Sequence, residues 1–434
     1  PEQGLAVNII YPAKARYKEG APVVVVVPTG NASSGLDFSM HAAQQGFIEI
    51  RFAFQGGGKP GFQSAGIYDG RGLQSRQALK DVLRFAAGQA SDSQGKTLKQ
   101  LVPVPVYNKS IGAVGWSNGG NILLTTMGTQ AAELPFVSWL AFYESPIGSI
   151  FFPPALGGSQ DLFANPHYRQ GTAATGKPII DFRKLMYQND VSKNLGAHKK
   201  AGEPEIPGVL FFDENSNHVW EESREFAFSY ATDIGVDKQI YAPAVTKGLI
   251  KHATLNQWPQ KVATVAESQA YFADRDGSLF IKDVAKSYPK LLVTIFASRL
   301  DHLQRQTDHP HIALQYNAWL ESKIKFLRLN PDPLYVAAIA GMRPESFIDN
   351  APGATIDSDS IDQTLEPEGM IPDYCFMEAA AAELSDRAYK GKFTYPLTAP
   401  LVEYSNGLSK DVAAPGAKPG AKPVVKPVSG ASPK

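Results

Sequence analysis

The chain has 434 residues, which is enough for a large hydrophobic core and for two or three domains. Its 42 Lys and Arg residues balance 42 Asp and Glu residues, so the net charge is zero, which argues against binding nucleic acid or a membrane surface mainly by charge. The hydrophobic share of 43% is typical of a globular protein, and the single cysteine, Cys375, excludes an intramolecular disulfide.

The first third of the chain predicts alternating strands and helices. An opening strand is expected over residues 5–11. Residues 21–27 form a continuous, mostly β-branched run, typical of a parallel strand covered by helices on both faces. This run is too short to span a bilayer, so we expect no membrane span. A loop of small residues follows it, then a helix-like segment over residues 36–45 and a second strand over residues 47–54.

A glycine-rich loop and a crossover helix come next. Gly56, Gly57 and Gly58 are followed by Lys59 and Pro60, so neither the Gly-Lys-Ser/Thr step nor the helix start of a phosphate-binding loop is present, and we interpret them as a close-packed loop near an active site. Apolar residues at helical spacing, from Leu79 to Ala86, predict a helix that ends at Gly88.

Residues 111–120 predict a strand, a sharp turn and the start of a helix. The turn has the pattern Gly-X-Ser-X-Gly, with Ser117 at its centre and Gly115 and Gly119 on either side. Such a turn lifts the serine hydroxyl clear of the sheet edge, and only small neighbours let strand and helix approach so closely. The alternative is a glycine-rich turn in which Ser117 merely caps the helix.

A further strand is predicted over residues 136–144. Strands and helices that alternate in this way predict an α/β fold with a doubly wound, mostly parallel sheet. We expect residues 1–150 to form the first part of this core. Residues 151–290, richer in prolines and polar residues, would form an inserted cap region over the active-site edge.

Two polar segments of the cap region contain possible calcium ligands. After a predicted strand over residues 208–212, Asp213, Asn215 and Asn217 alternate as they do in a calcium loop. However, His218 replaces the turning glycine and Arg224 stands in place of a bidentate glutamate, so a polar β-turn is the preferred interpretation. Residues 274–277 are expected to form a hairpin turn.

The second part of the core is expected over residues 291–400. A buried strand over residues 291–297 leads into a loop, residues 298–311, that contains His302, His309 and His311. A helix over residues 312–323 and a last strand over residues 324–329 follow, and then a peripheral helix, residues 373–389, capped by Asp373. Residues 401–434 form a predicted disordered tail of Ala, Pro and Lys.

These motifs together resemble the α/β-hydrolase superfamily, in particular its serine esterases, lipases and dienelactone hydrolases. The resemblance covers roughly residues 1–150 and 290–335, with a strand before Gly30, the turn at Ser117 and a strand before Asp301. It implies an α/β-hydrolase fold and a hydrolase with a Ser-His-acid triad, acting on carboxylic esters through an acyl-enzyme on Ser117. No cofactor is implied.

The chemistry of such a triad assigns the remaining residues. Ser117 needs a histidine to take its proton, and the histidine needs a carboxylate to fix its tautomer. The oxyanion of the tetrahedral intermediate needs two donors, which we assign to the amide of Asn118 and an amide at Gly30 or Asn31. Trp116 and Phe54 are expected to contact an apolar or aromatic group of the substrate.

The sequence departs from the family pattern at the histidine. In the family the base follows the last core strand, but no histidine occurs after His311. With Asp301 as the acid, we prefer His309 as the base, since seven residues of loop allow the chain to fold back. A second arrangement pairs Glu144 as acid with His302, and His311 also stays open.

Two other functions remain open. Asp301, His302, Asp308, His309 and His311 could together bind zinc, but Pro310 stiffens their spacing, so we expect no metal. A hydrolase-fold protein that has lost its base could instead bind a ligand or ion without catalysis.

We expect a small-molecule or polymeric ester as the substrate and no nucleic-acid partner. A secreted or periplasmic location is also expected, because the sequence begins with Pro1, as it would after removal of a leader, although a shortened chain accounts for Pro1 equally well.

Overall fold

The structure is a computed structural model of the chain. It describes residues 4–28, 35–37, 39–147, 167–169, 179–188, 209–230, 232–235, 238–240, 265–296, 310–329, 331 and 373–394. Within these residues, no helix is both long and apolar enough to cross a bilayer.

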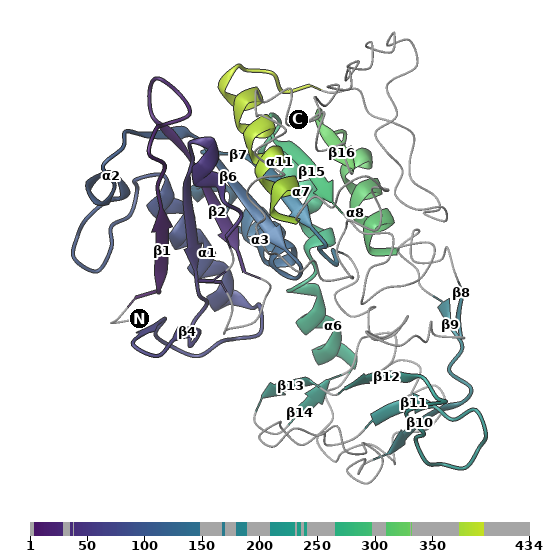
Figure 1. Cartoon of the computed structure of the whole chain (residues 1–434). Coiled ribbons are helices and arrows are strands. Elements are labelled where there is room, and N and C mark those ends of the chain that lie inside the picture. The colour runs from purple at the N-terminus through teal and green to yellow at the C-terminus, as the bar shows by residue number, and fades with distance from the viewer. Residues whose placement is uncertain are drawn as a thin grey trace, which may run out of the picture.

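A seven-stranded sheet forms the centre of the protein (Figure 1). Its strands lie in the order β1-β3-β2-β6-β7-β15-β16, and only β1 runs antiparallel to its neighbour. Their bounds are Val7–Ile10 (β1), Ala21–Val27 (β2), Ile48–Phe52 (β3), Val106–Trp116 (β6), Val137–Tyr143 (β7), Leu292–Phe296 (β15) and Leu327–Leu329 (β16). The predicted α/β fold with a doubly wound, mostly parallel sheet is confirmed.

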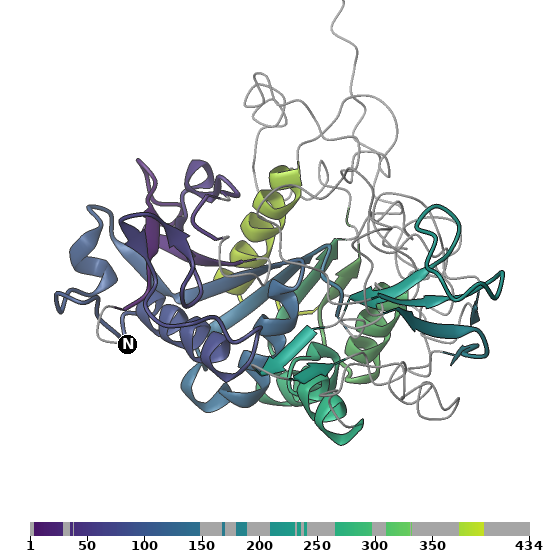
Figure 2. The ribbon, with the colours of Figure 1, turned by 90° about the horizontal axis from the view of Figure 1, so that it is seen from below.

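Helices cover both faces of this sheet, as the uninterrupted apolar strands require. Val23, Val25 and Val27 of β2 pack into a cluster with the helices α1 (Leu73–Ala86), α3 (Gly119–Thr129), α7 (Ile281–Ser287) and α8 (Pro310–Glu321). Val24 and Val26 face the other way, into a cluster with the helix α11 (Asp373–Tyr389). Figure 2 shows α11, in yellow, on the opposite side of the sheet from α1. All seven residues of β2 are buried as a result.

The helix α11 has its predicted bounds but is not peripheral. Met377, Leu384 and four consecutive alanines, Ala379–Ala382, are buried against the sheet, because alanine side chains let the helix approach closely. Its polar residues also bind the core: Glu383 forms a buried ion pair with Arg328 of β16 at 2.6 Å, and Asp386 accepts a hydrogen bond from Arg16 at 2.7 Å.

The remaining elements are short. They are β4 (Gly58–Lys59), β5 (Phe62–Gln63), β8 (Tyr168–Arg169), β9 (Ile179–Ile180), β10 (Leu185–Gln188), β11 (Val209–Phe212), β12 (Ala227–Tyr230), β13 (Thr232–Gly235), β14 (Lys238–Ile240), α2 (Leu98–Leu101), α6 (Val265–Ala273) and the 3₁₀ turns η1 (Ala42–Gln45), η2 (Ala131–Glu133) and η6 (Gly277–Phe280). Strands β10, β11 and β12 form a separate small sheet, away from the central one (Figure 1). The boundaries expected for the cap region and for the tail stay predictions.

Three local predictions differ from the structure. Of the helix expected over residues 36–45, the described part is helical only in the 3₁₀ turn Ala42–Gln45. The loop at Gly56–Gly58 continues into a small hairpin of β4 and β5. Residues 274–277 do not form a hairpin turn: they connect α6 to η6, because the carboxylate of Asp276 accepts a hydrogen bond from the amide of Ser278 and caps the turn.

Candidate active site

Ser117 lies in the sharp turn between β6 and α3, as predicted. Its φ angle is 48°, in the left-handed region that residues with a side chain rarely adopt. The Ser117 amide donates to the carbonyl of Tyr143 on β7 at 2.9 Å, and its carbonyl accepts from the amide of Gly120 at 3.0 Å. Neighbouring structure therefore holds the strained conformation, and Ser117 stays partly exposed, as do Trp116 and Asn118 beside it.

The glycines of the motif leave no room for a side chain. A methyl group on Gly115 would lie 2.6 Å from the Cα of Gly120, and one on Gly119 would collide with the carbonyls of Val27 and Pro28. Helix α3 thus packs directly against the ends of β6 and β2. This contact requires glycine at both positions.

Asn118 follows Ser117 at the beginning of α3. Its amide donates to no acceptor in the part of the chain that the structure describes. An amide with no partner at the N-terminus of a helix attracts negative charge. This position suits the oxyanion donor predicted from the sequence.

Asn121, one turn further along α3, connects three segments. Its amide nitrogen donates to the carbonyl of Pro146 at 3.2 Å, and its Oδ1 accepts from the amide of Gly277 at 2.8 Å. The side chain is fully buried. Asn121 was not singled out in the sequence, because its partners lie 25 and 156 residues further along the chain.

The register of the sheet brings the predicted catalytic segments to one edge. Trp116, Tyr143 and Phe296 are paired across β6, β7 and β15. Ser117 and Glu144, which follow Trp116 and Tyr143, therefore start from one level of the sheet, where β15 also ends. Val27 of β2 pairs with Gly115, so β2 ends at the same edge.

Glu144 has an unusual backbone at this edge. Its φ angle is 45°, and its amide donates to the carbonyl of Phe296 at 3.0 Å. The residue is partly buried, with Oε2 enclosed. Of the two candidate acids, Glu144 is the one whose position is described. It follows β7, the strand that neighbours β6, and so lies beside the strand end that carries Ser117.

Most of the other proposed site residues lie outside the described residues. These are Gly30, Asn31, Asp301, His302 and His309. His311 is in the first turn of α8, where only its backbone is described. Because α8 follows β15 in the chain, its first turn lies toward the edge that carries Ser117.

The two predicted substrate contacts are packed against aromatic neighbours. The ring of Trp116 stacks on Tyr143, with centroids 4.5 Å apart and an interplanar angle of 25°, and it keeps some exposure. Phe54 is fully buried and lies against Phe52 and Tyr68, at centroid distances of 5.1 and 5.9 Å. Trp116 can thus still offer a surface to substrate, whereas Phe54 is a core side chain.

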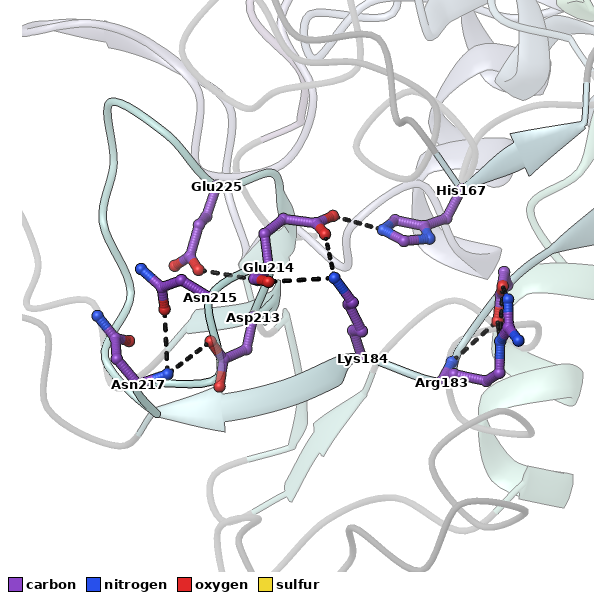
Figure 3. A network of polar contacts seen from close by, with 9 residues as sticks. His167, Arg183, Lys184, Asp213, Glu214, Asn215, Asn217 and Glu225 are labelled. Atoms are coloured by element: carbon purple, nitrogen blue, oxygen red, sulfur yellow. Dashed lines mark hydrogen bonds and ion pairs between the residues drawn. The ribbon is translucent and has the colours of Figure 1, made fainter.

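The predicted polar turn after β11 is present. The Asn217 amide donates to the Asp213 carboxylate at 3.1 Å and to Asn215 Oδ1 at 3.0 Å (Figure 3). The Asp213 carboxylate also accepts from the amide of His218 at 3.0 Å. Backbone amides thus occupy the oxygens that a calcium ion would need. Among the described residues, no group of three or more His, Cys, Asp or Glu side chains is arranged to bind a metal.

Two further carboxylates support this turn. Glu214 lies between Lys184 Nζ at 2.7 Å and His167 Nε2 at 2.6 Å, and the hydrogen bond from Lys184 lowers its pKa (Figure 3). Glu225 accepts from the amides of Glu214 and Glu221, while burial raises its pKa. The Glu225 contacts are internal to this segment, whereas Glu214 connects the turn to His167 and Lys184.

The comparisons with known proteins give structural neighbours only. No protein-family model matches the sequence, and no curated protein matches it. A mutant of the rice cell wall degrading esterase LipA from Xanthomonas oryzae is similar at 12% identity and a TM-score of 0.34, over 89% of this chain and 86% of that chain.

Two further solved structures are similar in the same way. Candida antarctica lipase A in its closed state has 13% identity and a TM-score of 0.29, over 91% of this chain and 85% of that chain. A mutant of N-acyl homoserine lactonase AidH has 16% identity and a TM-score of 0.27, over 69% and 76%. At these scores, the activities of the three proteins are not transferred to this chain.

Proposed function

We propose that the protein is a serine hydrolase that cleaves carboxylic esters through an acyl-enzyme on Ser117. The proposal depends on the conformation of Ser117. Its backbone has a φ angle of 48°, and the residue lies between the end of a parallel strand and the start of a helix. A serine that only capped α3 would accept a hydrogen bond from the helix amides, yet the N-cap of α3 is Asn118, and the Ser117 hydroxyl accepts no bond from any residue that the structure describes.

The first step would form the acyl-enzyme. A histidine takes the proton of the Ser117 hydroxyl while the oxygen attacks the ester carbonyl. The resulting oxyanion would accept hydrogen bonds from the amide of Asn118 and from an amide at Gly30 or Asn31. The same histidine then gives its proton to the departing alcohol, and the acyl group stays on Ser117.

Water completes the cycle. The histidine takes a proton from a water molecule as its oxygen attacks the acyl carbon. The bond between the acyl carbon and Ser117 Oγ then breaks, the histidine returns the proton to Oγ, and the carboxylic acid is released. The net reaction consumes one ester and one water. No cofactor takes part in this proposal.

Two assignments of base and acid are proposed. The first uses His309 with Asp301, both in the segment that follows β15. The second uses His302 with Glu144 and is favoured by one observation, the position of Glu144 beside Ser117 at the ends of paired strands. Trp116, partly exposed on the same edge, would contact an apolar or aromatic part of the ester.

Turnover of short-chain 4-nitrophenyl esters tests the proposal. We expect the wild-type protein to release 4-nitrophenolate and Ser117→Ala to lose this activity by at least a thousandfold. Ser93→Ala is the matched control, because Ser93 is exposed in the loop between α1 and α2. If the wild-type protein cleaves no ester, the alternative function, a hydrolase fold that binds a ligand or ion without catalysis, is supported instead.

A further inference from the structure

The loop between β3 and α1 contains an arginine without a counterion. Arg71 makes no hydrogen bond or ion pair with any residue that the structure describes, and its Nε is fully enclosed. The rest of the side chain keeps partial exposure. A buried guanidinium nitrogen without an acceptor is unfavourable in the unliganded protein, so an unpartnered arginine of this kind invites an anion.

The backbone around Arg71 is fixed in an unusual conformation. Arg71 itself has a φ angle of 72° and follows Gly70 at 61°. The carbonyls of Asp69 and Gly70 accept hydrogen bonds from Arg275, at 3.1 and 2.7 Å. These hydrogen bonds from Arg275 hold the loop, so named contacts support the strained backbone at Arg71, as is common at binding sites.

No described carboxylate is left to neutralise Arg71. The Asp69 carboxylate accepts from the amides of Gly72 and Gln74 and from the Ser75 hydroxyl, at 3.0, 2.6 and 2.6 Å, and so caps α1. The Asp274 carboxylate pairs with Arg76 at 2.7 Å and with Arg275 at 3.3 Å. Both nearby acids are therefore engaged elsewhere.

The groups that face Arg71 are two tyrosines and a second guanidinium. Tyr68, Tyr271 and Arg275 interact electrostatically with the Arg71 guanidinium. The guanidinium carbon of Arg275 lies 3.7 Å from the centroid of the Tyr271 ring. Burial raises the pKa of Tyr68 to about 12, so its hydroxyl stays uncharged at neutral pH. The site thus combines two guanidinium groups with the neutral phenol of Tyr68.

This site belongs to the same edge of the sheet as Ser117. The loop leaves the end of β3, which is parallel to β2 and β6. Arg275, which holds Gly70, is two residues from Gly277, whose amide is bound by Asn121 of α3. Two residues span at most about 7 Å, so one short segment connects the loop of Arg71 to the helix that begins at the nucleophile.

We propose that Arg71 binds a carboxylate of the substrate, so that the enzyme prefers esters that carry a negative charge elsewhere in the molecule. A planar guanidinium matches a carboxylate with two parallel hydrogen bonds. This inference rests on the hydrolase function proposed above and names its substrate class.

Charged and neutral esters of equal length test the inference. The charged series is the mono-4-nitrophenyl esters of glutarate, adipate and suberate, and the neutral series is the matching 4-nitrophenyl alkanoates. For the charged ester that wild type cleaves best, we expect Arg71→Gln to lower kcat/KM by about 10- to 100-fold, with less than a threefold change for its neutral counterpart. Arg71→Lys should keep part of the preference, because it keeps the charge but not the paired hydrogen bonds.

Arg84→Gln is the control, since it removes a guanidinium from the other end of α1. An equal loss on both series in Arg71→Gln would show that Arg71 only supports the fold, and it would overturn the inference. No preference of the wild-type protein for any charged ester would do the same.

A binding measurement separates this inference from the proposed function. Calorimetry with Ser117→Ala and mono-4-nitrophenyl adipate should show binding that Arg71→Gln weakens at least tenfold. Binding that depends on Arg71 in a protein that cleaves no ester would contradict the hydrolase function but keep the anion site. Turnover of neutral esters without such binding would contradict only the anion site.

Discussion

Ser117 and Glu144 share a strained backbone conformation at the ends of neighbouring strands. Their φ angles are 48° and 45°, and each follows one residue of the paired couple Trp116 and Tyr143. Each amide also donates to the carbonyl at the end of the next strand, Ser117 to Tyr143 and Glu144 to Phe296. The same backbone strain thus occurs at the ends of two adjacent strands. It places Ser117, which carries a hydroxyl, and Glu144, which carries a carboxyl, at neighbouring positions on one edge of the sheet.

Removing each candidate acid should distinguish the two proposed triads. With Asp301 as the acid, Asp301→Asn should lower kcat by about ten-thousandfold, because the histidine loses the group that fixes its tautomer. Glu144→Gln should then cost less than tenfold. The measurement is steady-state hydrolysis of a 4-nitrophenyl ester, repeated with His309→Asn and His302→Asn. A large loss of kcat in Glu144→Gln and His302→Asn, with little loss in Asp301→Asn and His309→Asn, would instead assign Glu144 as the acid and His302 as the base.

Gly119→Ala should destabilise the turn that holds Ser117. The added methyl would collide with the carbonyls of Val27 and Pro28, which belong to backbone and cannot move aside cheaply. We expect a loss of about 2–3 kcal/mol in the free energy of unfolding and a marked loss of esterase activity. Gly95→Ala is a useful comparison, since nothing lies within 4 Å of the added methyl and only its φ of 78° is unfavourable. Equal stability of the two variants would contradict the close packing.

Asn121→Ala should cost more than the loss of one surface hydrogen bond. It would leave the carbonyl of Pro146 and the amide of Gly277 buried without their partner, with an expected cost of about 2–4 kcal/mol measured by urea denaturation. Asn108→Ala serves as the control, because Asn108 makes one partly buried bond, to the carbonyl of Ala87 at 3.2 Å. A cost below 1 kcal/mol for Asn121→Ala would mean that this connection is not important for stability.

Glu378 should make the protein less stable as the pH rises from about 4.5 to about 7. Burial raises its pKa to about 7, with a further increase from Glu49, while a hydrogen bond from Gln45 opposes the shift. Between the ordinary pKa of about 4.5 and pH 7, the folded protein therefore holds a proton that the unfolded chain has released. The free energy of unfolding should fall by roughly 3 kcal/mol across this range.

Glu378→Gln tests this pH dependence. The variant cannot ionise, so it should match the wild-type protein at pH 5 and exceed its stability at pH 8. Glu222→Gln, an exposed substitution of the same chemistry, should leave the wild-type profile unchanged. If Glu378→Gln lowers stability equally at both pH values, Glu378 acts by its shape or its hydrogen bond to Gln45 and not by its charge.

The strands and the turn at Ser117 could be predicted because their causes are local. Buried β-branched residues over Ala21–Val27 and the glycines at 115 and 119 are sufficient for a covered parallel strand and a close strand-helix approach. Helix α11 shows the limit of such reasoning. Its bounds follow from its own residues, but its position on the sheet depends on Arg16 and Arg328, which are distant in sequence.

The supports of the site could not be predicted for the same reason. In the sequence, Asn121 and Arg71 are ordinary polar residues. Their setting depends on the segment 274–277, in which Gly277 donates to Asn121 and Arg275 donates to the carbonyl of Gly70, next to Arg71. Asp276 caps the 3₁₀ turn η6 that follows α6, although Asp-Arg-Asp-Gly in isolation favours a hairpin. Contacts between residues more than 150 positions apart leave no periodic pattern in the sequence.

The most direct test of the hydrolase proposal is covalent labelling of Ser117 with a fluorophosphonate. Intact-mass measurement should show one adduct per chain, and peptide mapping should place it on Ser117. Ser117→Ala should take up none, whereas Ser93→Ala should label like the wild-type protein. An unlabelled wild-type protein, or an adduct that persists in Ser117→Ala, would contradict a nucleophilic role for this serine.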